Sequence, residues 1–115
     1  MRIFVAGKYG ASSGLSLEEL EANVQKAIEA ARELIKKGHT PYIPHLMHYV
    51  DRYGGDKLLP ELEWQLLSIK WLEQCEAIYM LPNFIESEGA RYELAIAMAR
   101  KMPVYYKLED IKEDK

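Results

Sequence analysis

The sequence predicts one α/β domain built on a mostly parallel β-sheet. Three observations lead to this class: short apolar segments alternate with amphipathic helical patterns, the chain has 115 residues, and its composition is 49% hydrophobic and 29% charged. This length is enough for one hydrophobic core and too short for two ordinary domains, and the balance is typical of globular proteins. Strands that alternate with helices are joined by right-handed crossovers, so we expect parallel strands in the spatial order 2-1-3-4.

The first strand and the first helix have clear signals. Residues 2–6 (RIFVA) form a β-branched and aromatic run that Gly7 ends, which is typical of a buried strand followed by a tight turn. Ser16 and Glu19 then form a capping box in front of apolar residues spaced along one helical face. Because Gly38 is a C-terminal stop signal, we expect the helix to end just before it.

The middle of the chain predicts a strand, a loop and a second helix. Residues 40–43 form the strand, and residues 44–59 lack a clear period, which favours a long and functional loop. Pro60 begins the helix as its first residue, and the helical pattern continues to Gln74. This helix has two apolar stripes, the first made of Leu62, Leu66, Ile69 and Leu72 and the second of Trp64, Leu67 and Trp71.

The last third of the chain completes the alternation. We expect a strand at residues 77–81, a helix at 89–100, a fourth strand at 103–106 and room for a fifth short strand. Residues 107–115 are charged and predict a tail that frays, so the domain spans residues 1–106. The whole pattern predicts a Rossmann-like or flavodoxin-like three-layer fold. In such folds ligands bind where the chain reverses direction, so loops 7–15 and 82–89 should line one pocket.

The loop at residues 7–14 (GKYGASSG) is the first candidate binding segment. It is rich in glycine and hydroxyl groups and precedes a helix, so its backbone N–H groups could hold an anion. Its spacing matches neither the dinucleotide fingerprint nor the Walker loop, and a flexible turn is the alternative interpretation.

The segment after the third predicted strand is the second candidate. Gly89 and Ala90 let the backbone approach a ligand at the start of a helix, and Glu93 follows in the first turns, on the side of Ser87. A glutamate at this place is often only a partner of the helix dipole. A catalytic role for Glu93 therefore needs further support.

That support is a resemblance to a known family. Residues 87–93 (SEGARYE), with Leu81-Pro82 before them and Pro103-Val104 after them, resemble the nucleoside 2-deoxyribosyltransferase-like superfamily. The segments VAG (5–7), KGH (37–39) and PHL (44–46), together with Asn23, are similar to small members of that superfamily, so the resemblance covers nearly the whole chain.

The resemblance implies N-glycosidic bond chemistry in which the equivalent of Glu93 attacks the anomeric carbon of a (deoxy)ribosyl group. A carboxylate suits this step because it captures an oxocarbenium-like centre as a glycosyl-enzyme, which water or a second base then resolves. Transferases of the superfamily tend to carry an aspartate at the position of Ser87, whereas nucleoside monophosphate N-glycosidases carry a serine that contacts phosphate. The resemblance favours a nucleotide, while the base, the sugar and the choice between hydrolysis and transfer stay open.

One position departs from the superfamily. Where its members usually have an aspartate that positions the substrate and protonates the leaving base, this chain has Ser68, a poor general acid near neutral pH. Tyr9, His45 or Glu63 could replace it, or the chain could bind nucleotides or nucleotide sugars without cleaving them. We expect Glu93 and Tyr9 to be catalytic. The expected substrate-binding residues are Gly7, Lys8, Ser12, Ser13, His45, Ser68, Asn83, Ser87, Gly89 and Ala90.

Several other functions are disfavoured. The net charge of −3 without a basic block argues against nucleic acid as a partner. His45 and His48 lack further ligands, so we predict no metal and no cofactor. The apolar runs are too short for a membrane span. Cys75 is alone and predicts a small buried side chain, which fits a reducing cytoplasm.

The two-striped helix predicts self-association. Only one stripe can lie on the sheet of so small a domain, and the stripe with Trp64, Leu67 and Trp71 would leave an apolar patch in water. A two-fold contact between two copies would cover it. We expect a homodimer or an assembly of dimers, with the second subunit close to the cleft beside Ser68.

Overall fold

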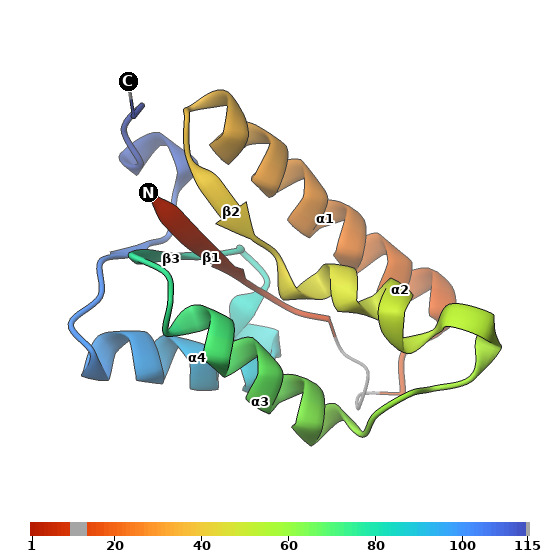
Figure 1. Cartoon of the computed structure of the whole chain (residues 1–115). Coiled ribbons are helices and arrows are strands. Elements are labelled where there is room, and N and C mark those ends of the chain that lie inside the picture. The colour runs from red at the N-terminus through yellow and green to blue at the C-terminus, as the bar shows by residue number, and fades with distance from the viewer. Residues whose placement is uncertain (10–13, 115) are drawn as a thin grey trace.

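The central feature is a sheet of four parallel strands in the order β2-β1-β3-β4 (Figure 1). The computed structural model describes residues 1–9 and 14–114. The strands are β1 (Arg2–Ala6), β2 (Thr40–Tyr42), β3 (Ala77–Met80) and β4 (Val104–Tyr105). The predicted α/β class and strand order are therefore confirmed, and the described residues contain no fifth strand.

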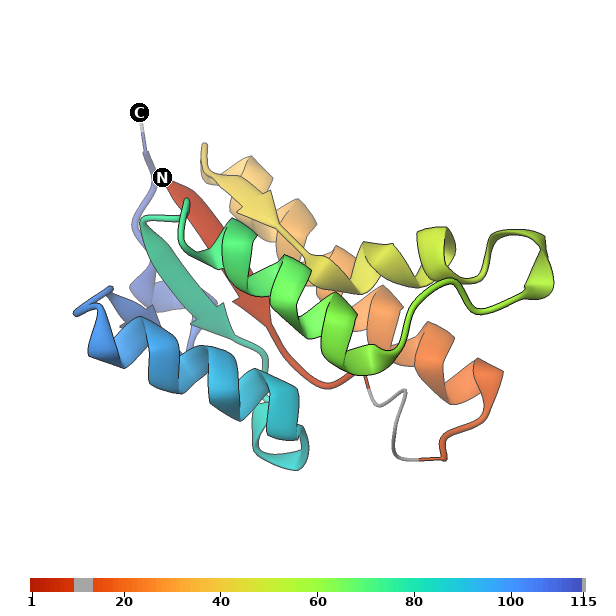
Figure 2. The same cartoon turned by 60° about the horizontal axis from the view of Figure 1, so that its bottom comes forward.

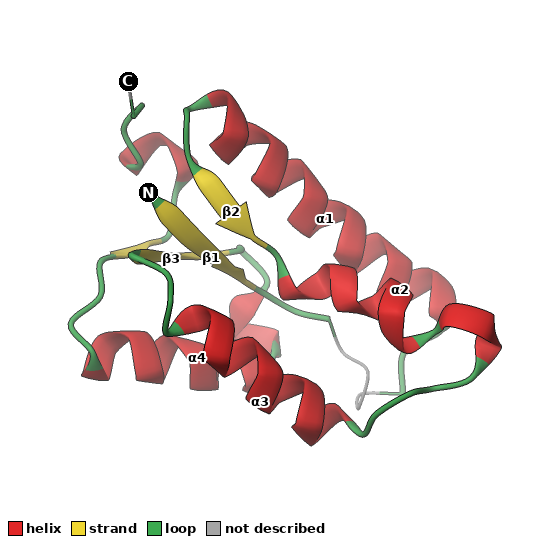
Figure 3. Ribbon diagram, viewed as in Figure 1, coloured by secondary structure: helices red, strands yellow, loops and turns green. Residues whose placement is uncertain are grey.

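Helices cover both faces of this sheet (Figure 3). The α-helices are α1 (Leu17–Lys36), α2 (Met47–Asp51), α3 (Glu61–Leu72) and α4 (Glu88–Ala99). The 3-10 turns are η2 (Pro44–Leu46), η3 (Tyr53–Gly55), η4 (Phe84–Glu86) and η5 (Leu108–Asp110). Helix α1 lies on one face, and α3 and α4 lie on the other (Figures 1 and 2).

Strand β1 separates the two halves of the core. Successive side chains of a strand point to opposite faces, so Ile3 and Val5 pack under α1 whereas Phe4 and Ala6 pack under α4. All four are fully buried. A strand that is apolar on both faces is expected for a parallel sheet between two helical layers, which explains the continuous run RIFVA.

The helix boundaries follow their local signals closely. The Ser16 side chain accepts the Glu19 N–H and the Glu19 carboxylate accepts the Ser16 N–H, so the predicted capping box is present. The predicted loop at residues 44–59 is wrong in part, because it contains α2, η2 and η3. Each of these helices is too short to show a helical period in the sequence. Pro60 is the N-cap of α3 and not its first helical residue.

The predicted faces of α3 are wrong in part. Leu72 is buried and Trp71 is 55% exposed, as their stripes predicted. Leu62 and Leu66, which were assigned to the sheet, are 70% and 54% exposed, while Ser68 is buried. Trp64, which was assigned to the outer stripe, is half-buried. The inward face of this helix lines a pocket and is therefore partly polar, so apolar spacing does not identify the side that faces the protein.

Residues 107–114 pack against the domain, whereas the sequence predicted a tail that frays. Ile111 is buried in the core under α1. The Lys37 Nζ donates to the Ile111 carbonyl oxygen at 2.8 Å, and the His39 ring lies 2.7 Å from the Lys112 carbonyl oxygen. The amine of Met1 pairs with Asp114 at 3.2 Å, so both ends of the described chain lie together (Figure 1). Within residues 1–9 and 14–114, none of the helices combines the length and apolar character that crossing a bilayer would need.

Candidate active site

A pocket of about 100 Å³ lies where the segments after β1 and β2 meet α3 and the N-terminus of α4. Figure 2 shows α3 between α4 and the segment that contains η2 and α2. Many of the predicted site residues line this pocket. They are Gly7, Tyr9, His45, Ser68, Ser87, Gly89, Ala90 and Glu93.

Two further predicted residues, Lys8 and Asn83, are not part of this lining. The Lys8 backbone N–H donates to the Asn83 Oδ1 at 3.0 Å, and the Lys8 Nζ pairs with Glu86 at 3.1 Å. These contacts join the loop after β1 to the loop after β3, so Lys8 and Asn83 hold the two loops together. Ser12 and Ser13 lie outside the described residues.

Glu93 is the main ionisable group of the pocket. Glu93 is only 5% exposed, and its Oε2 accepts a hydrogen bond from the Gln65 Nε2 at 3.0 Å. Burial raises the pKa of Glu93 from 4.5 to about 8, and the hydrogen bond from Gln65 opposes this shift only in part. The carboxyl is therefore mostly neutral at pH 7 in this structure.

Gln65 was not predicted from the sequence, and its position depends on a glycine. A Cβ atom added at Gly89 would lie 2.5 Å from the Gln65 Oε1, which is too close for an ordinary contact. The absence of a side chain at Gly89 thus lets the amide of Gln65 reach Glu93 across the start of α4. The sequence suggested that a glycine at position 89 lets a ligand approach closely. The packing of Gln65 is a second reason for a glycine at this position.

The N-terminus of α4 gives the pocket a site suited to an anion. The Ser87 side chain is the N-cap and accepts the Ala90 N–H at 3.1 Å, so its hydroxyl proton can still donate to a ligand. A helix of 12 residues presents unpaired N–H groups and a partial positive charge at this end. Ser87, Gly89 and Ala90 therefore form a part of the pocket that can bind a phosphate.

His45 adds an unused polar group to the same pocket. The residue is 4% exposed, and neither ring nitrogen has a hydrogen-bond partner among the described residues. Burial lowers the pKa of His45 from 6.5 to about 4, and the nearby backbone of Gly7 and Lys8 opposes this shift only in part. The ring is neutral at pH 7 and can offer one donor and one acceptor to a ligand.

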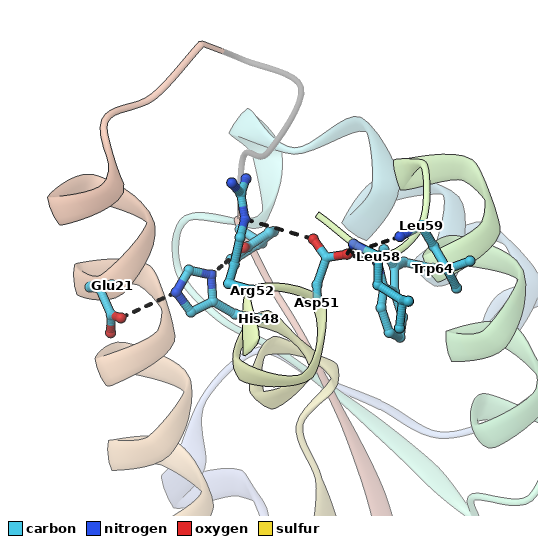
Figure 4. Close-up of polar contacts among 8 residues, drawn as sticks. Glu21, His48, Asp51, Arg52, Leu58, Leu59 and Trp64 are labelled. Atoms are coloured by element: carbon cyan, nitrogen blue, oxygen red, sulfur yellow. Dashed lines mark hydrogen bonds and ion pairs between the residues drawn. The ribbon is translucent and has the colours of Figure 1, made fainter. Parts of the chain in front are cut away.

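Tyr9 is connected to a second histidine. Its hydroxyl makes a short hydrogen bond with the His48 Nδ1, and the His48 Nε2 lies 3.1 Å from the Glu21 Oε1 (Figure 4). Burial raises the pKa of Tyr9, and the charge of Arg52 opposes this shift. From the sequence, His48 was only one of two histidines without further metal ligands, because nothing in its spacing pairs it with Tyr9 or Glu21.

Asp51 fixes the outer wall of the pocket. Its Oδ1 accepts the N–H groups of Leu58 and Leu59 at 3.0 and 3.1 Å and the Trp64 Nε1–H at 2.7 Å (Figure 4). Burial raises the pKa of Asp51, but these hydrogen bonds outweigh burial and the net pKa is lowered. Trp64 is therefore held in the pocket wall. The ring of Trp71 instead stacks on the ring of Tyr42, with 5.2 Å between the ring centroids.

Two remaining predictions concern Glu63 and metals. Glu63 is exposed and does not line the pocket, so it is a poor substitute for the missing aspartate. Within residues 1–9 and 14–114 there is no group of three or more histidine, cysteine, aspartate or glutamate side chains that could hold a metal ion. Cys75 is half-buried against the core on the α4 side, and burial raises its thiol pKa.

These features define a small α/β domain with a ligand pocket at the carboxyl ends of its parallel strands. The family described as "Domain of unknown function (DUF4406)" matches residues 1–106, and the chain belongs to this family. No curated protein matches the sequence. The fold is similar to that of a solved 2-deoxyribosyltransferase from the psychrotolerant bacterium Bacillus psychrosaccharolyticus, with 16% identity and a TM-score of 0.59. That match covers 100% of this chain and 93% of the enzyme chain, so the likeness extends over the whole fold.

Proposed function

We propose that this chain cleaves or transfers the N-glycosidic bond of a nucleoside or nucleoside 5′-monophosphate, with Glu93 as the nucleophile. The observation that carries the proposal is a buried carboxyl, held by Gln65, in the same pocket as Tyr9 and the N-terminus of α4. The fold shared with a 2-deoxyribosyltransferase and the SEGARYE motif around Glu93 support the same chemistry.

The proposed reaction begins with an attack of one Glu93 oxygen on the anomeric carbon. The bond to the base breaks, its electron pair goes to the base nitrogen, and a glycosyl-enzyme ester forms. Water then releases the free sugar, or a second base takes it. Because Gln65 donates to the Oε2 of Glu93, the Oε1 is the oxygen that remains for the attack.

The phosphate-binding features favour a monophosphate. The Ser87 hydroxyl and the Gly89 N–H lie at the positive end of α4, where the helix dipole and hydrogen bonds would stabilise a phosphate. His45, with both ring nitrogens unpaired among the described residues, can add one further hydrogen bond to the sugar or the phosphate.

The second candidate function is nucleotide binding without turnover. Two observations favour it: Ser68 stands where the superfamily usually has an aspartate, and Glu93 is mostly protonated at pH 7. Ser68→Asp is the discriminating change, since it restores a carboxyl in the pocket wall. Binding by an inert wild type, combined with base release by the variant, would establish this second function.

The main experiment measures free base. The protein is incubated with a panel of ribo- and deoxyribonucleosides and their 5′-monophosphates, with and without a second base, and products are separated by chromatography. We expect base release or exchange with at least one monophosphate, and a glycosyl adduct on Glu93 in the mass spectrum of the quenched enzyme. Glu93→Gln should abolish both signals, whereas Glu29→Gln, on the exposed side of α1, should keep them. Absence of base release from every substrate would refute the enzymatic proposal.

We further propose that the chain forms dimers through α3 and α4. Leu62, Leu66 and Trp71 of α3 and Tyr92 and Met98 of α4 are all more than half exposed, although they are large and apolar. Both helices lie on the same face of the sheet (Figure 2), so a two-fold contact could cover this surface. Trp64 is not a suitable probe of this contact, because it is hydrogen-bonded to Asp51 inside the subunit.

A further inference from the structure

A chain of polar side chains leads from the pocket to the surface of the protein. It begins at Tyr9, which lines the pocket, continues through the buried ring of His48, and ends at Glu21, whose side chain is 41% exposed. The three residues come from the segment after β1, from α2 and from α1. This arrangement brings together residues that are 39 and 27 positions apart in the sequence.

His48 is built into this chain from both sides. Its Nδ1 is bonded to the Tyr9 hydroxyl and its Nε2 to Glu21 (Figure 4). Tyr49 donates to the other oxygen of Glu21 at 2.9 Å. The other charged groups beside the Tyr9–His48 pair are Arg52 and Asp51, which form an ion pair with 3.7 Å between the Arg52 Nε and the Asp51 Oδ2. Glu21 is therefore the one carboxylate bonded to the ring among the described residues, and it ties the far nitrogen of the ring to the protein surface.

The proposed reaction needs a proton at this place. A departing purine or pyrimidine leaves poorly as an anion, and Ser68 cannot supply a proton near neutral pH. His45 is also a poor source, because its ring is buried and neutral. Tyr9 has a proton and lines the pocket, but alone it would be left as a half-buried phenolate, and burial raises the pKa of its hydroxyl despite the charge of Arg52.

We propose that Tyr9, His48 and Glu21 form a relay that delivers the proton to the leaving base, an inference that rests on the proposed glycosidic function. As the C–N bond breaks, its electron pair takes the Tyr9 hydroxyl proton. The Tyr9 oxygen takes the Nδ1 proton of the imidazolium, and His48 becomes neutral with its Nε2–H still bonded to Glu21. A proton from solvent, entering beside Glu21, restores the imidazolium before the next turnover.

In this relay His48 and Glu21 are positioning and proton-storing residues, whereas Tyr9 is the group that touches the substrate. The relay predicts dependence on the leaving group: it matters for a natural base, which needs a proton, and not for 4-nitrophenolate, which leaves without one. A purely structural role for His48 would affect both kinds of substrate equally.

The test compares His48→Gln and Glu21→Gln with wild type on two substrates: the monophosphate that the protein cleaves best, and the matching 4-nitrophenyl glycoside 5′-phosphate. We expect His48→Gln to slow release of the natural base by about 100-fold, the lower range for general acid catalysis, and to change nitrophenol release by less than about threefold. Glu21 lies at the surface, so Glu21→Gln should fold, and it should slow release of the natural base more than release of nitrophenol.

His39→Gln is the matched control, because His39 is also a buried, hydrogen-bonded histidine but lies at the opposite end of the strands, beside Met1. It should leave the ratio of the two rates unchanged. Equal losses on both substrates in His48→Gln or in Glu21→Gln would refute the relay while leaving the glycosidase in place. A wild type that releases neither base nor nitrophenol would instead refute the proposed function, and the catalytic relay with it.

Discussion

Replacing Glu93 by glutamine should stabilise the protein, and the gain should grow with pH. A buried carboxyl whose pKa is raised from 4.5 to about 8 binds a proton more tightly in the folded state than in the unfolded state. Folding stability that depends on this proton is complete below pH 4.5 and is lost progressively as the pH rises to 8. Glutamine is neutral at every pH and avoids this loss.

The magnitude follows from the two pKa values. Relative to wild type, Glu93→Gln should gain about 1 kcal/mol in the free energy of unfolding at pH 5, about 3 kcal/mol at pH 7 and about 5 kcal/mol at pH 9. For a domain of this size, 3 kcal/mol corresponds to roughly 10 °C in Tm. The Gln65 amide can still pair with the new side chain, because an amide both donates and accepts.

Urea unfolding followed by circular dichroism at pH 5, 7 and 9 measures the effect. Glu29→Gln is the matched control: the same chemical change at an exposed position of α1 should produce a small difference that does not depend on pH. If Glu93→Gln is no more stable than wild type at pH 9, or if its gain is constant between pH 5 and 9, the carboxyl does not have a raised pKa and the reasoning is wrong.

Three further changes probe the pocket and the surface. Gly89→Ala places a methyl group against the Gln65 amide, so the pKa of Glu93 should rise further and the rising limb of the pH–rate profile should move to higher pH with little loss of stability. Asp51→Ala removes an acceptor of three hydrogen bonds and should cost about 3 kcal/mol in urea unfolding at pH 7. Because the pKa of Asp51 is lowered, wild type loses this advantage as the pH falls through the folded pKa, and the two proteins should converge in acid. Leu66→Glu should give a monomer in light scattering at micromolar concentration, and an unchanged dimer would place the interface elsewhere.

The fold was predictable because its signals are local. A run such as RIFVA, buried on both faces, can only be a central strand, and the capping box at Ser16 fixes the start of α1 within one residue. The strand order then follows from the handedness of the crossovers. The helices that the sequence did not reveal, α2 and the short 3-10 turns, have too few residues to produce a period.

The pocket was predictable only where a motif marks it. Glu93, Ser87 and Gly89 lie in one short segment and were found through its resemblance to a known family. Gln65 and His48 act through partners 28 and 39 residues away, and a contact at such a distance leaves no pattern in a single sequence. The same reason explains the misassigned faces of α3: whether this helix covers a core or a pocket depends on elements elsewhere in the chain.

The protonation of Glu93 is compatible with a role as nucleophile. With a pKa of about 8, roughly one molecule in ten has an ionised carboxyl at pH 7, which lowers the rate by about tenfold and does not abolish it. A bound phosphate dianion would raise the pKa further by repulsion, whereas the positive charge that develops on the sugar ring would favour the anion. The ionised minority is therefore the form that attacks, and its negative charge is neutralised as the ester bond to the sugar forms. The same burial that destabilises the carboxylate in the free protein makes its attraction to an oxocarbenium-like centre stronger than it would be in water. With the 4-nitrophenyl substrate, whose leaving group needs no proton, a rate that rises with pH through 8 in wild type, and a rising limb moved upward in Gly89→Ala, would both follow from this balance. A flat profile between pH 6 and 9 on that substrate would show that Glu93 is ionised throughout this range.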